Sequence, residues 1–391
     1  MNYILFDGPS RNNLLPFTFT RPVADIRVGI LTIREKWEKF LGCTTTTITE
    51  DYLSNKYPMV EMDENVMINA SFLPNMELVE IIKNLKQNQA VFEDEDVIAF
   101  FSTETQEEVN FDSYEAIEFN SDVIKIEHTW DIFSKNGEAL QEDFNLITKG
   151  RDSQPLPETV HCINGKNIFI EEGAKVEIAV LNASKGPIYI GKDAEIMEAC
   201  SIRGPFALCE NAIVKMGAKI YGPTTVGPYS TVGGEVNNSV IFGYSNKGHD
   251  GYLGSSVLGE WCNLGADTNN SNLKNNYAQV RIWDYNTESF AKTGLQFCGL
   301  MMGDHSKCGI NTMFNTGTVV GVSANIFGSG FPRNFVPSFS WGGNKGFTTY
   351  LTKKAFEVAK IVMARKNIEF TEQDAAILTH VFEDTKTFRR D

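Results

Sequence analysis

Histidine and cysteine are scarce in this chain of 391 residues, which has five of the first and seven of the second. No two cysteines form a CxxC pair and their number is odd, so neither a disulfide framework nor a zinc ribbon is indicated. We expect most of the thiols to be reduced and buried. The chain also lacks any run of about 18 apolar residues, the length that a membrane-spanning helix needs.

Positive charge is also in short supply. The chain has 35 lysines and arginines against 50 aspartates and glutamates, a net charge of −15, whereas a nucleic-acid-binding surface normally carries a basic stripe. We therefore expect a small-molecule ligand, held by a few local cations, and neither a nucleic acid nor a membrane as partner. The opening MNYILFDGPSR has no basic segment of the kind that starts a signal peptide, which predicts a cytoplasmic location.

The chain does contain a six-residue repeat of apolar residues. Eight consecutive positions of this register hold Ile, Leu or Val, a result that chance would give about once in a thousand trials at this hydrophobic content. They are Ile190, Ile196, Ile202, Leu208, Val214, Ile220, Val226 and Val232. The register resumes at Leu258 and Leu264 and at five positions from 302 to 326. The pattern resembles the hexapeptide repeat of the left-handed parallel β-helix, whereas the alternative, a β-sandwich, would alternate with period two.

Three segments follow from this assignment. Residues 1–155 mix apolar runs with helix-like stretches such as ILTIREKWEKFL and predict an α/β domain, which ends near the linker SQPLPETV. Residues 156–346 form the β-helix, and residues 347–391 form C-terminal helices, one of them capped by Thr371 and Asp374. The register is lost between Thr268 and Leu300, so we expect a long loop that projects from the β-helix there.

The run KGHDGYLGSSVLGEWCNLGADT, which begins at Lys247, resembles the acetyltransferase half of the bifunctional N-acetylglucosamine-1-phosphate uridylyltransferases and glucosamine-1-phosphate acetyltransferases, the GlmU-like family. The resemblance implies a general base, His249, with Tyr252 and Asn263 as further catalytic residues. It implies that four residues bind substrate: Glu235, Lys247, Asn272 and Lys274. Two positions depart from the family pattern, since Ser255 stands for an aspartate and Asp267 for a glycine.

The chemistry of acetyl transfer needs such residues. An amine that attacks a thioester must be neutral, and histidine is the side chain that supplies a base near neutral pH without large perturbation. The tetrahedral oxyanion needs a donor, which Asn263 or a backbone N–H provides. His305 is a weaker candidate, interpreted as a polar turn residue. A catalytic zinc, the rival interpretation, normally has three protein ligands, and residues 190–326 hold only these two histidines, so no metal ligand is assigned.

The amino terminus carries a second, fainter resemblance. The stretch LFDGPSRNNLLPFTFTRP is similar to the glycine-rich signature of sugar nucleotidyltransferases, which implies that Gly8 and Arg11 lie at the nucleotide phosphates, with Arg21 and Arg27 as further cations. The family's lysine and second glycine are missing. Where its magnesium-binding aspartate is expected, VMINASFLPN offers Asn69, although Mg²⁺ prefers carboxylate oxygens.

Nearly the whole chain is similar to the alternative, Bacteroidetes-type form of this bifunctional family, which has a shortened nucleotidyltransferase domain. The resemblance implies an acetyl-CoA-dependent N-acetyltransferase that acts on an amino-sugar 1-phosphate. It further implies nucleotidyl transfer that depends on Mg²⁺ in the first domain, and a homotrimer. The alternative is a non-catalytic or regulatory protein that binds sugar nucleotides. The sequence does not name the sugar phosphate, the acyl group or the nucleotide base.

Overall fold

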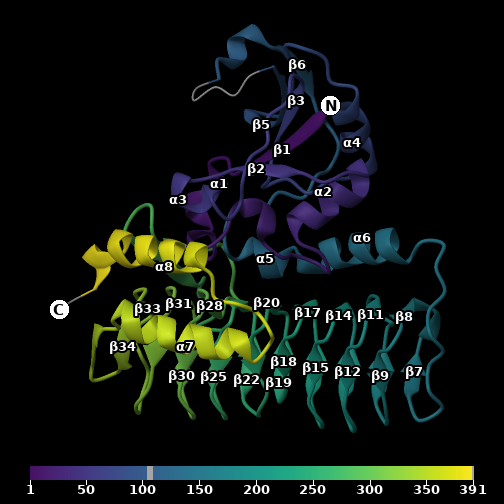
Figure 1. Ribbon diagram of the computed structural model, residues 1–391. Helices are drawn as coiled ribbons and strands as arrows, with labels where there is room; N and C mark the ends of the chain where they lie inside the picture. The colour runs from purple at the N-terminus through teal and green to yellow at the C-terminus, as the bar shows by residue number, and fades with distance from the viewer. Residues whose placement is uncertain (104–108, 390–391) are drawn as a thin grey trace.

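The computed structural model describes residues 1–103 and 109–389. It consists of an α/β domain, a parallel β-helix and two C-terminal helices, as Figure 1 shows. The fold class predicted from the sequence is therefore confirmed. None of the helices in the described residues is long and apolar enough to cross a bilayer.

The N-terminal domain has one six-stranded sheet in the order β2-β1-β3-β5-β4-β6, with β1 parallel to both of its neighbours. Its strands are β1 (Asn2–Phe6), β2 (Thr46–Ile48), β3 (Asn65–Asn69), β4 (Gln89–Glu93), β5 (Asp96–Ser102) and β6 (Glu115–Glu118). Its helices are α1 (Ser10–Asn13), α2 (Ile33–Leu41), α3 (Asp51–Ser54), α4 (Met76–Lys83), α5 (Asp131–Ser134) and α6 (Asn136–Thr148). The short 3-10 helices are η1 (Phe17–Phe19), η2 (Val23–Asp25) and η3 (Phe111–Ser113).

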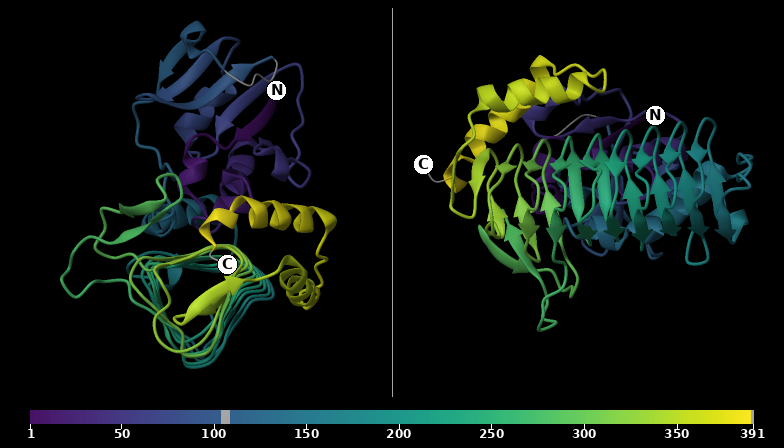
Figure 2. Two further views of the ribbon diagram at one scale, coloured as in Figure 1. Left: turned by 90° about the vertical axis from the view of Figure 1, so that its left-hand side faces the viewer. Right: turned by 90° about the horizontal axis from the view of Figure 1, so that it is seen from below.

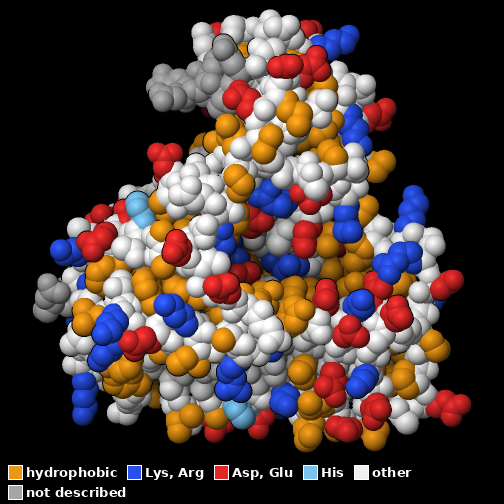
Figure 3. All heavy atoms as spheres, viewed as in Figure 1, with side chains coloured by type: hydrophobic (Ala, Val, Ile, Leu, Met, Phe, Trp, Pro, Cys, Tyr) orange, Lys and Arg blue, Asp and Glu red, His pale blue; other side chains and the backbone are white. Residues whose placement is uncertain are grey.

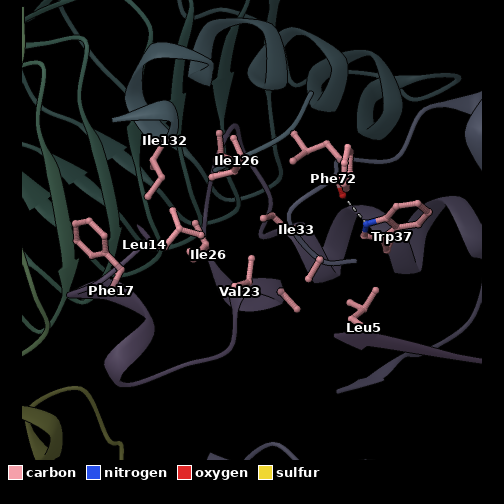
Figure 4. Close-up of a cluster of buried hydrophobic side chains, with 14 of the residues drawn as sticks. Leu5, Leu14, Phe17, Val23, Ile26, Ile33, Trp37, Phe72, Ile126 and Ile132 are labelled. Carbon is pink, nitrogen blue, oxygen red and sulfur yellow. Dashed lines mark hydrogen bonds between the residues drawn. The ribbon is translucent and has the colours of Figure 1, made fainter. Parts of the chain in front are cut away.

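The core of this domain lies where α2 packs beside the sheet (Figure 4). Helix α2 begins at a capping box of Thr32 and Glu35 and ends at Gly42, whose φ of 80° lies in the left-handed region that suits glycine. Trp37, on this helix, is fully buried and donates its Nε1–H to the carbonyl oxygen of Phe72 over 2.9 Å. The buried indole is thus satisfied at its polar atom as well as at its apolar rings.

The β-helix is a prism of three parallel sheets, best seen end-on in Figure 2. The first sheet contains β7 (His161–Ile163), β10 (Val180–Asn182), β13 (Ser201–Arg203), β16 (Lys219–Tyr221), β19 (Glu235–Asn237) and β22 (Tyr252–Gly254). The second contains β8 (Ile168–Ile170), β11 (Ile188–Ile190), β14 (Phe206–Leu208), β17 (Thr224–Val226), β20 (Val240–Gly243), β23 (Val257–Glu260), β28 (Leu300–Met302), β31 (Thr318–Val320) and β33 (Phe335–Val336). The third contains β9 (Lys175–Val176), β12 (Glu195–Ile196), β15 (Ile213–Val214), β18 (Thr231–Val232), β21 (Asn246–Lys247), β24 (Asn263–Leu264), β29 (Lys307–Cys308), β32 (Asn325–Ile326), β34 (Ser340–Gly343) and the antiparallel β35 (Gly346–Thr349).

The apolar core of the prism is the six-residue register itself. All eight residues of the predicted run, from Ile190 to Val232, are buried and belong to one cluster inside the prism. The resumed positions Leu258, Leu264 and Met302 belong to the same cluster. One residue in six points into the prism. Because the parallel strands of successive coils stack in register, each of these residues packs on the equivalent residue of the next coil.

The N-terminal domain sits on the outer face of the second sheet. Outward-facing Val240 and Val257 join the same apolar cluster as the N-terminal core, and the ring of Phe17 lies 5.2 Å from that of Phe242. Figure 4 shows Phe17 directed toward the strands of the β-helix. Helix α6 extends this contact along the second sheet, where Leu140 packs with Ala207. The two domains therefore share one continuous core.

The predicted excursion from the β-helix is present between β24 and β28. It contains β25 (Asn269–Asn270), which pairs with β30 (Met313–Phe314), and the antiparallel hairpin of β26 (Arg281–Asp284) and β27 (Ser289–Lys292). Figure 2 shows the hairpin projecting beside the prism. Its tip also meets the N-terminal domain, because Asn286 donates to Asn13 and the ring of Tyr285 lies edge-on to Phe19.

The C-terminal helices α7 (Thr352–Ala364) and α8 (Glu372–Asp384) are followed by η5 (Lys386–Phe388). The cap predicted from Thr371 and Asp374 is present at the start of α8 as a capping box. Helix α8 packs against α3 of the N-terminal domain, and Lys56 pairs with Asp374 over 2.8 Å. The helix thus bridges the α/β domain and the β-helix (Figure 1).

Candidate functional site

The turn that carries His249 joins β21 of the third sheet to β22 of the first sheet. His249 is exposed at this corner. Gly251 has φ of 112°, and a Cβ atom there would lie 2.1 Å from the carbonyl oxygen of Thr268 in the next coil. Only glycine fits so close an approach with that backbone conformation. The local sequence thus presents the histidine to solvent on a turn with little freedom to move.

Lys247 holds this turn from inside the prism. It is 2% exposed, pairs in register with the core residue Val232, and its Nζ donates to the carbonyl oxygens of Gly233 over 3.0 Å and His249 over 2.8 Å. Burial lowers the pKa of Lys247 to about 8, because desolvation disfavours the ammonium form. The substrate-binding role of Lys247 stays a prediction, and in this structure its ammonium group lies on backbone oxygens.

The lowered pKa of Lys247 predicts a pH-dependent stability. Between pH 8 and 10.5 the unfolded chain binds more protons at this residue than the folded chain, so the free energy of unfolding that it contributes rises with pH. Lys247→Met removes this contribution. The stability of the native chain relative to Lys247→Met should therefore increase from pH 7 to pH 10, measured by urea denaturation.

The exposed Lys175, in the same sheet, provides the matched control for that measurement. Lys175→Met should leave the difference from the native chain unchanged over the same pH range. A constant difference for Lys247→Met as well would contradict the assignment.

The structure brings together three of the predicted site residues on the outer face of the first sheet. Glu235 and Tyr252 are direct neighbours in adjacent strands. The Nδ2 of Asn272 donates to the hydroxyl of Tyr252 over 3.1 Å and to the hydroxyl of Ser255 over 3.2 Å. Ser255, which stands where the resembling family has aspartate, thus positions the asparagine. We call Glu235, Tyr252 and Asn272 the first-sheet cluster.

Two residues of the same face went unnoticed in the sequence. The hydroxyl of Tyr221 donates to Oε1 of Glu235 over 2.7 Å, and Nζ of Lys219 lies 4.0 Å from the other carboxylate oxygen. The hydrogen bond with Glu235, together with desolvation, raises the pKa of Tyr221 to about 12. Lys219 pairs in register with Glu235, one coil earlier. Aligning successive coils of the repeat, rather than searching for a motif, would have found both.

Asn263 lies on a different face from the first-sheet cluster. It stands on the third sheet, between Asn246 and Lys307 in register, and its Oδ1 accepts from Nδ2 of Asn246 over 2.9 Å. Its own Nδ2 has no hydrogen-bond partner among the described residues. Within the same residues, no side-chain hydrogen bond joins His249 to Asn263 or to Tyr252. The corner that carries His249 lies between these two faces.

His305 lies on a half-buried turn of the β-helix near helix α8. Its ring stacks against Trp261 with 6.2 Å between centroids, and its Nδ1 is buried without a hydrogen-bond partner. Burial lowers its pKa to about 3, because desolvation disfavours the charged imidazolium. So weak a base is poorly suited to accept a proton near neutral pH, which leaves the exposed His249 as the better placed of the two.

The glycine-rich turn of the N-terminal domain is occupied by internal contacts. Arg11 is buried and donates to Oδ2 of Asp7 over 2.8 Å, to the carbonyl oxygen of Thr18 over 2.7 Å and to the hydroxyl of Tyr52 over 2.9 Å. Gly8 has φ of 58°, and a Cβ atom there would lie 2.8 Å from Oδ1 of Asn69. The backbone turn is present, but the hydrogen-bond donors of Arg11 beside it are used in contacts within the N-terminal domain.

The other two predicted nucleotide-binding arginines are also buried and paired. Arg21 pairs with Asp304 and, over 3.2 Å, with Glu260, both of which belong to the β-helix. Arg27 donates to the carbonyl oxygen of Ile30 and lies 3.6 Å from Glu35. Figure 3 shows charged side chains of both signs gathered in the hollow between the N-terminal domain and the β-helix. The nucleotide-binding role of these residues stays a prediction.

The residues at the glycine-rich turn do not fit a magnesium ion. The nearest carboxylate, Asp7, is buried and shared by Arg11, Thr49 and the N–H of Val23. Oδ1 of Asn69 accepts from both the N–H and the hydroxyl of Ser71. Among the residues that the structure describes, no group of three or more His, Cys, Asp or Glu side chains is placed to hold a metal.

The fold joins an α/β domain to a parallel β-helix that carries polar side chains at one corner, the architecture of a two-domain transferase. Residues 3–152 match the sugar nucleotidyl transferase family. The chain is 34% identical over 87 residues to the "Bifunctional protein GlmU" of Methanocaldococcus jannaschii, covering 22% of this chain and 21% of that protein. It is 26% identical over 210 residues to the protein of that name from Methanococcus maripaludis strain C5, covering 54% and 44%.

A third relative is the "Bifunctional sugar-1-phosphate nucleotidylyltransferase/acetyltransferase" of Sulfurisphaera tokodaii, 29% identical over 146 residues. That match covers 37% of this chain and 36% of the relative. The chain thus spans less than half the length of these relatives. The resemblance to the GlmU-like family that the sequence indicated is confirmed.

Proposed function

We propose that this protein is an acetyl-CoA-dependent N-acetyltransferase that acts on an amino-sugar 1-phosphate. One observation carries the proposal: an exposed histidine, His249, lies at the corner beside the first-sheet cluster of Glu235, Tyr252 and Asn272. A base and a set of polar groups that can hold a sugar are thus near each other. The name of the Sulfurisphaera tokodaii relative, which includes an acetyltransferase, supports this activity.

The chemistry proceeds by attack of the neutral amine on the thioester. The new N–C bond forms as His249 accepts the proton of the amine, and the C–S bond then breaks to release the thiolate of coenzyme A, which takes up a proton. The carboxylate of Glu235 and the amide and hydroxyl of the cluster hold the sugar hydroxyls. Asn263 donates its free Nδ2–H to the oxyanion. Lys274 completes the substrate-binding set of this proposal, whereas Lys247 holds the turn of His249 through its backbone oxygens.

The test is an assay of the full chain with acetyl-CoA and glucosamine-1-phosphate. Release of coenzyme A and formation of the N-acetylated sugar phosphate, both followed by mass spectrometry, are expected. A panel of other amino-sugar phosphates identifies the preferred substrate. Absence of coenzyme A release with every member of the panel contradicts the proposal.

The burial of three arginines favours a second function for the N-terminal domain, the binding of a sugar nucleotide without catalysis. Arg11, Arg21 and Arg27 are all buried against carboxylates and carbonyl oxygens, so a domain that binds a sugar nucleotide without catalysis competes with one that transfers a nucleotidyl group. Pyrophosphate release from UTP or dTTP with a sugar 1-phosphate decides between them. Release supports transfer, and ligand binding by calorimetry without release supports the binding function.

The assembly that fits this proposal is a homotrimer. The N-terminal domain and the C-terminal helices lie on the other faces of the prism (Figure 2), while Ile163 and Val180 on the first sheet remain exposed. Exposed apolar side chains that lie together mark a surface for association, and most soluble oligomers are symmetric assemblies of identical chains. Light scattering that gives the mass of a single chain, 43.7 kDa, at micromolar concentration contradicts this assembly.

A further inference from the structure

A large pocket lies at the C-terminal end of the β-helix, and Lys274 is the one candidate site residue that lines it. Its volume is about 1110 Å³. The hairpin β26–β27, the last strands of the second and third sheets and η5 line it. Pockets for small molecules and cofactors typically measure about 300–1,000 Å³, so the pocket is large enough for a ligand the size of a nucleotide.

Positive charge gathers around this pocket. Lys274, Arg281, Arg333 and Arg389 line it, against a single acidic residue, Glu288. This contrasts with the net charge of −15 for the chain as a whole. In the part of the chain that the structure describes, no carboxylate lies within salt-bridge distance of Lys274, Arg281 or Arg333. Among the described residues, these three cations are therefore not neutralised by ion pairs, unlike Arg11 or Arg21.

Aromatic side chains form the second feature of the pocket. The indole of Trp283 stacks on Phe335 with 4.2 Å between ring centroids, and Phe388 packs edge-on against it at 6.1 Å. Phe290 and Phe347 also line the pocket. The Nε1 of Trp283 is buried without a hydrogen-bond partner, and such a donor is costly to leave unsatisfied. A polar atom of a ligand, or a water molecule, can accept the hydrogen bond of this N–H group.

We propose that this pocket binds the nucleoside diphosphate part of a nucleotide ligand. Phosphate oxygens are the groups that arginine recognises best, through charge-assisted and often bidentate hydrogen bonds. A base has a π-face that packs against aromatic side chains. Lys274, Arg281 and Arg333, together with a wall of aromatic rings in the same pocket, match both halves of such a ligand. Coenzyme A and a nucleoside diphosphate sugar both carry this chemistry.

The pocket adjoins the proposed acetyl-transfer site within one chain. Thr316 lines the pocket, and its hydroxyl is hydrogen-bonded to that of Ser271 over 2.8 Å. Ser271 precedes Asn272 of the first-sheet cluster, and Lys274 follows it by two residues. The binding inference stands on the pocket alone and does not rest on acetyl transfer.

Titration calorimetry of the full chain with ADP, UDP, coenzyme A and inorganic phosphate tests the proposal. Arg333 is exposed and forms no salt bridge among the described residues, so Arg333→Ala should fold normally. It should weaken binding of the nucleotide about ten- to hundredfold, the effect of losing one hydrogen-bonded charge. Glu288→Gln should strengthen binding, because it removes the one negative charge of the pocket. Arg365→Ala, an exposed arginine at the end of α7, is the matched control and should change nothing.

The four ligands separate the sources of the nucleotide. Binding of coenzyme A and ADP without UDP supports a coenzyme site, and binding of UDP supports a sugar-nucleotide site. The proposal is overturned if none of the nucleotides binds at millimolar concentration, or if inorganic phosphate binds as tightly as ADP. Equal nucleotide affinity of the native chain and Arg333→Ala also overturns it, because the ligand then lies elsewhere. Nucleotide binding by a native chain that shows no acetyl transfer contradicts only the proposed function, and acetyl transfer by a native chain that binds none of these nucleotides contradicts only the pocket, so the two failures can be told apart.

Discussion

Replacing His249 by alanine is expected to lower the rate of acetyl transfer by about 10² to 10⁴, the usual effect of losing a general base. The activity should recover in part at high pH, where the substrate amine loses its proton without help. The change should leave the fold intact, because the side chain is exposed and makes no side-chain hydrogen bond among the described residues. The measurement is the rate of coenzyme A release as a function of pH.

The variant Asn263→Ala separates the base from the oxyanion donor. Its rate should fall by about 10² to 10³, but its pH profile should keep the native shape because the base remains. The control is His161→Ala, an exposed histidine on β7 of the same β-helix, which should retain native activity. If His249→Ala keeps full activity towards all amino-sugar phosphates, His249 is not the general base and this corner is an ordinary polar turn.

Arg21→Ala is expected to destabilise the junction between the two domains by about 3–5 kcal/mol, the cost of leaving one partner of a buried ion pair alone. Side chains of Arg21 and Asp304 are only 6% and 5% exposed. Oδ2 of Asp304 also accepts from the hydroxyl of Thr20 over 2.8 Å, but hydrogen bonds do not replace the lost charge. Urea denaturation followed by tryptophan fluorescence measures the loss.

Two further variants show whether the buried charge is the cause. Lys56→Ala removes a more exposed ion pair, that with Asp374, at the same junction, and should cost about 0–1 kcal/mol. The double variant Arg21→Ala with Asp304→Asn should recover part of the stability, because no buried charge is left unpaired. If Arg21→Ala is as stable as Lys56→Ala and instead abolishes nucleotide binding, the arginine serves the ligand rather than the junction.

The β-helix could be predicted because its signal is local and repeated. Ile190 and the seven residues that follow it at steps of six, up to Val232, all point into the prism, so successive coils repeat the same packing rule. The cap at Thr371 is similarly local, since the side chain and the N–H that it accepts from lie three residues apart.

The candidate site could be predicted only in part. Sequence motifs named Tyr252 and Asn272, which do meet in space, but missed Tyr221, whose contact with Glu235 depends on the length of one coil. Lys247 was named for its charge, yet its position in the inward register decides that the ammonium meets backbone oxygens. Charge is visible in a sequence, whereas the direction of a side chain depends on register.

The sequence by itself determined the apolar repeat, the scarcity of metal ligands and the polar motif around His249, because each is a property of neighbouring residues along the chain. Only the tertiary structure decided which arginines are paired with carboxylates. Arg21 and Arg333 are indistinguishable as residue types, but packing of the N-terminal domain on the second sheet buries Arg21 against Asp304, while Arg333 lines an open pocket without a salt bridge among the described residues. A cation is available to a ligand where the fold places no carboxylate beside it. Contacts between segments distant in the sequence decide where carboxylates lie, so the sequence alone does not show it.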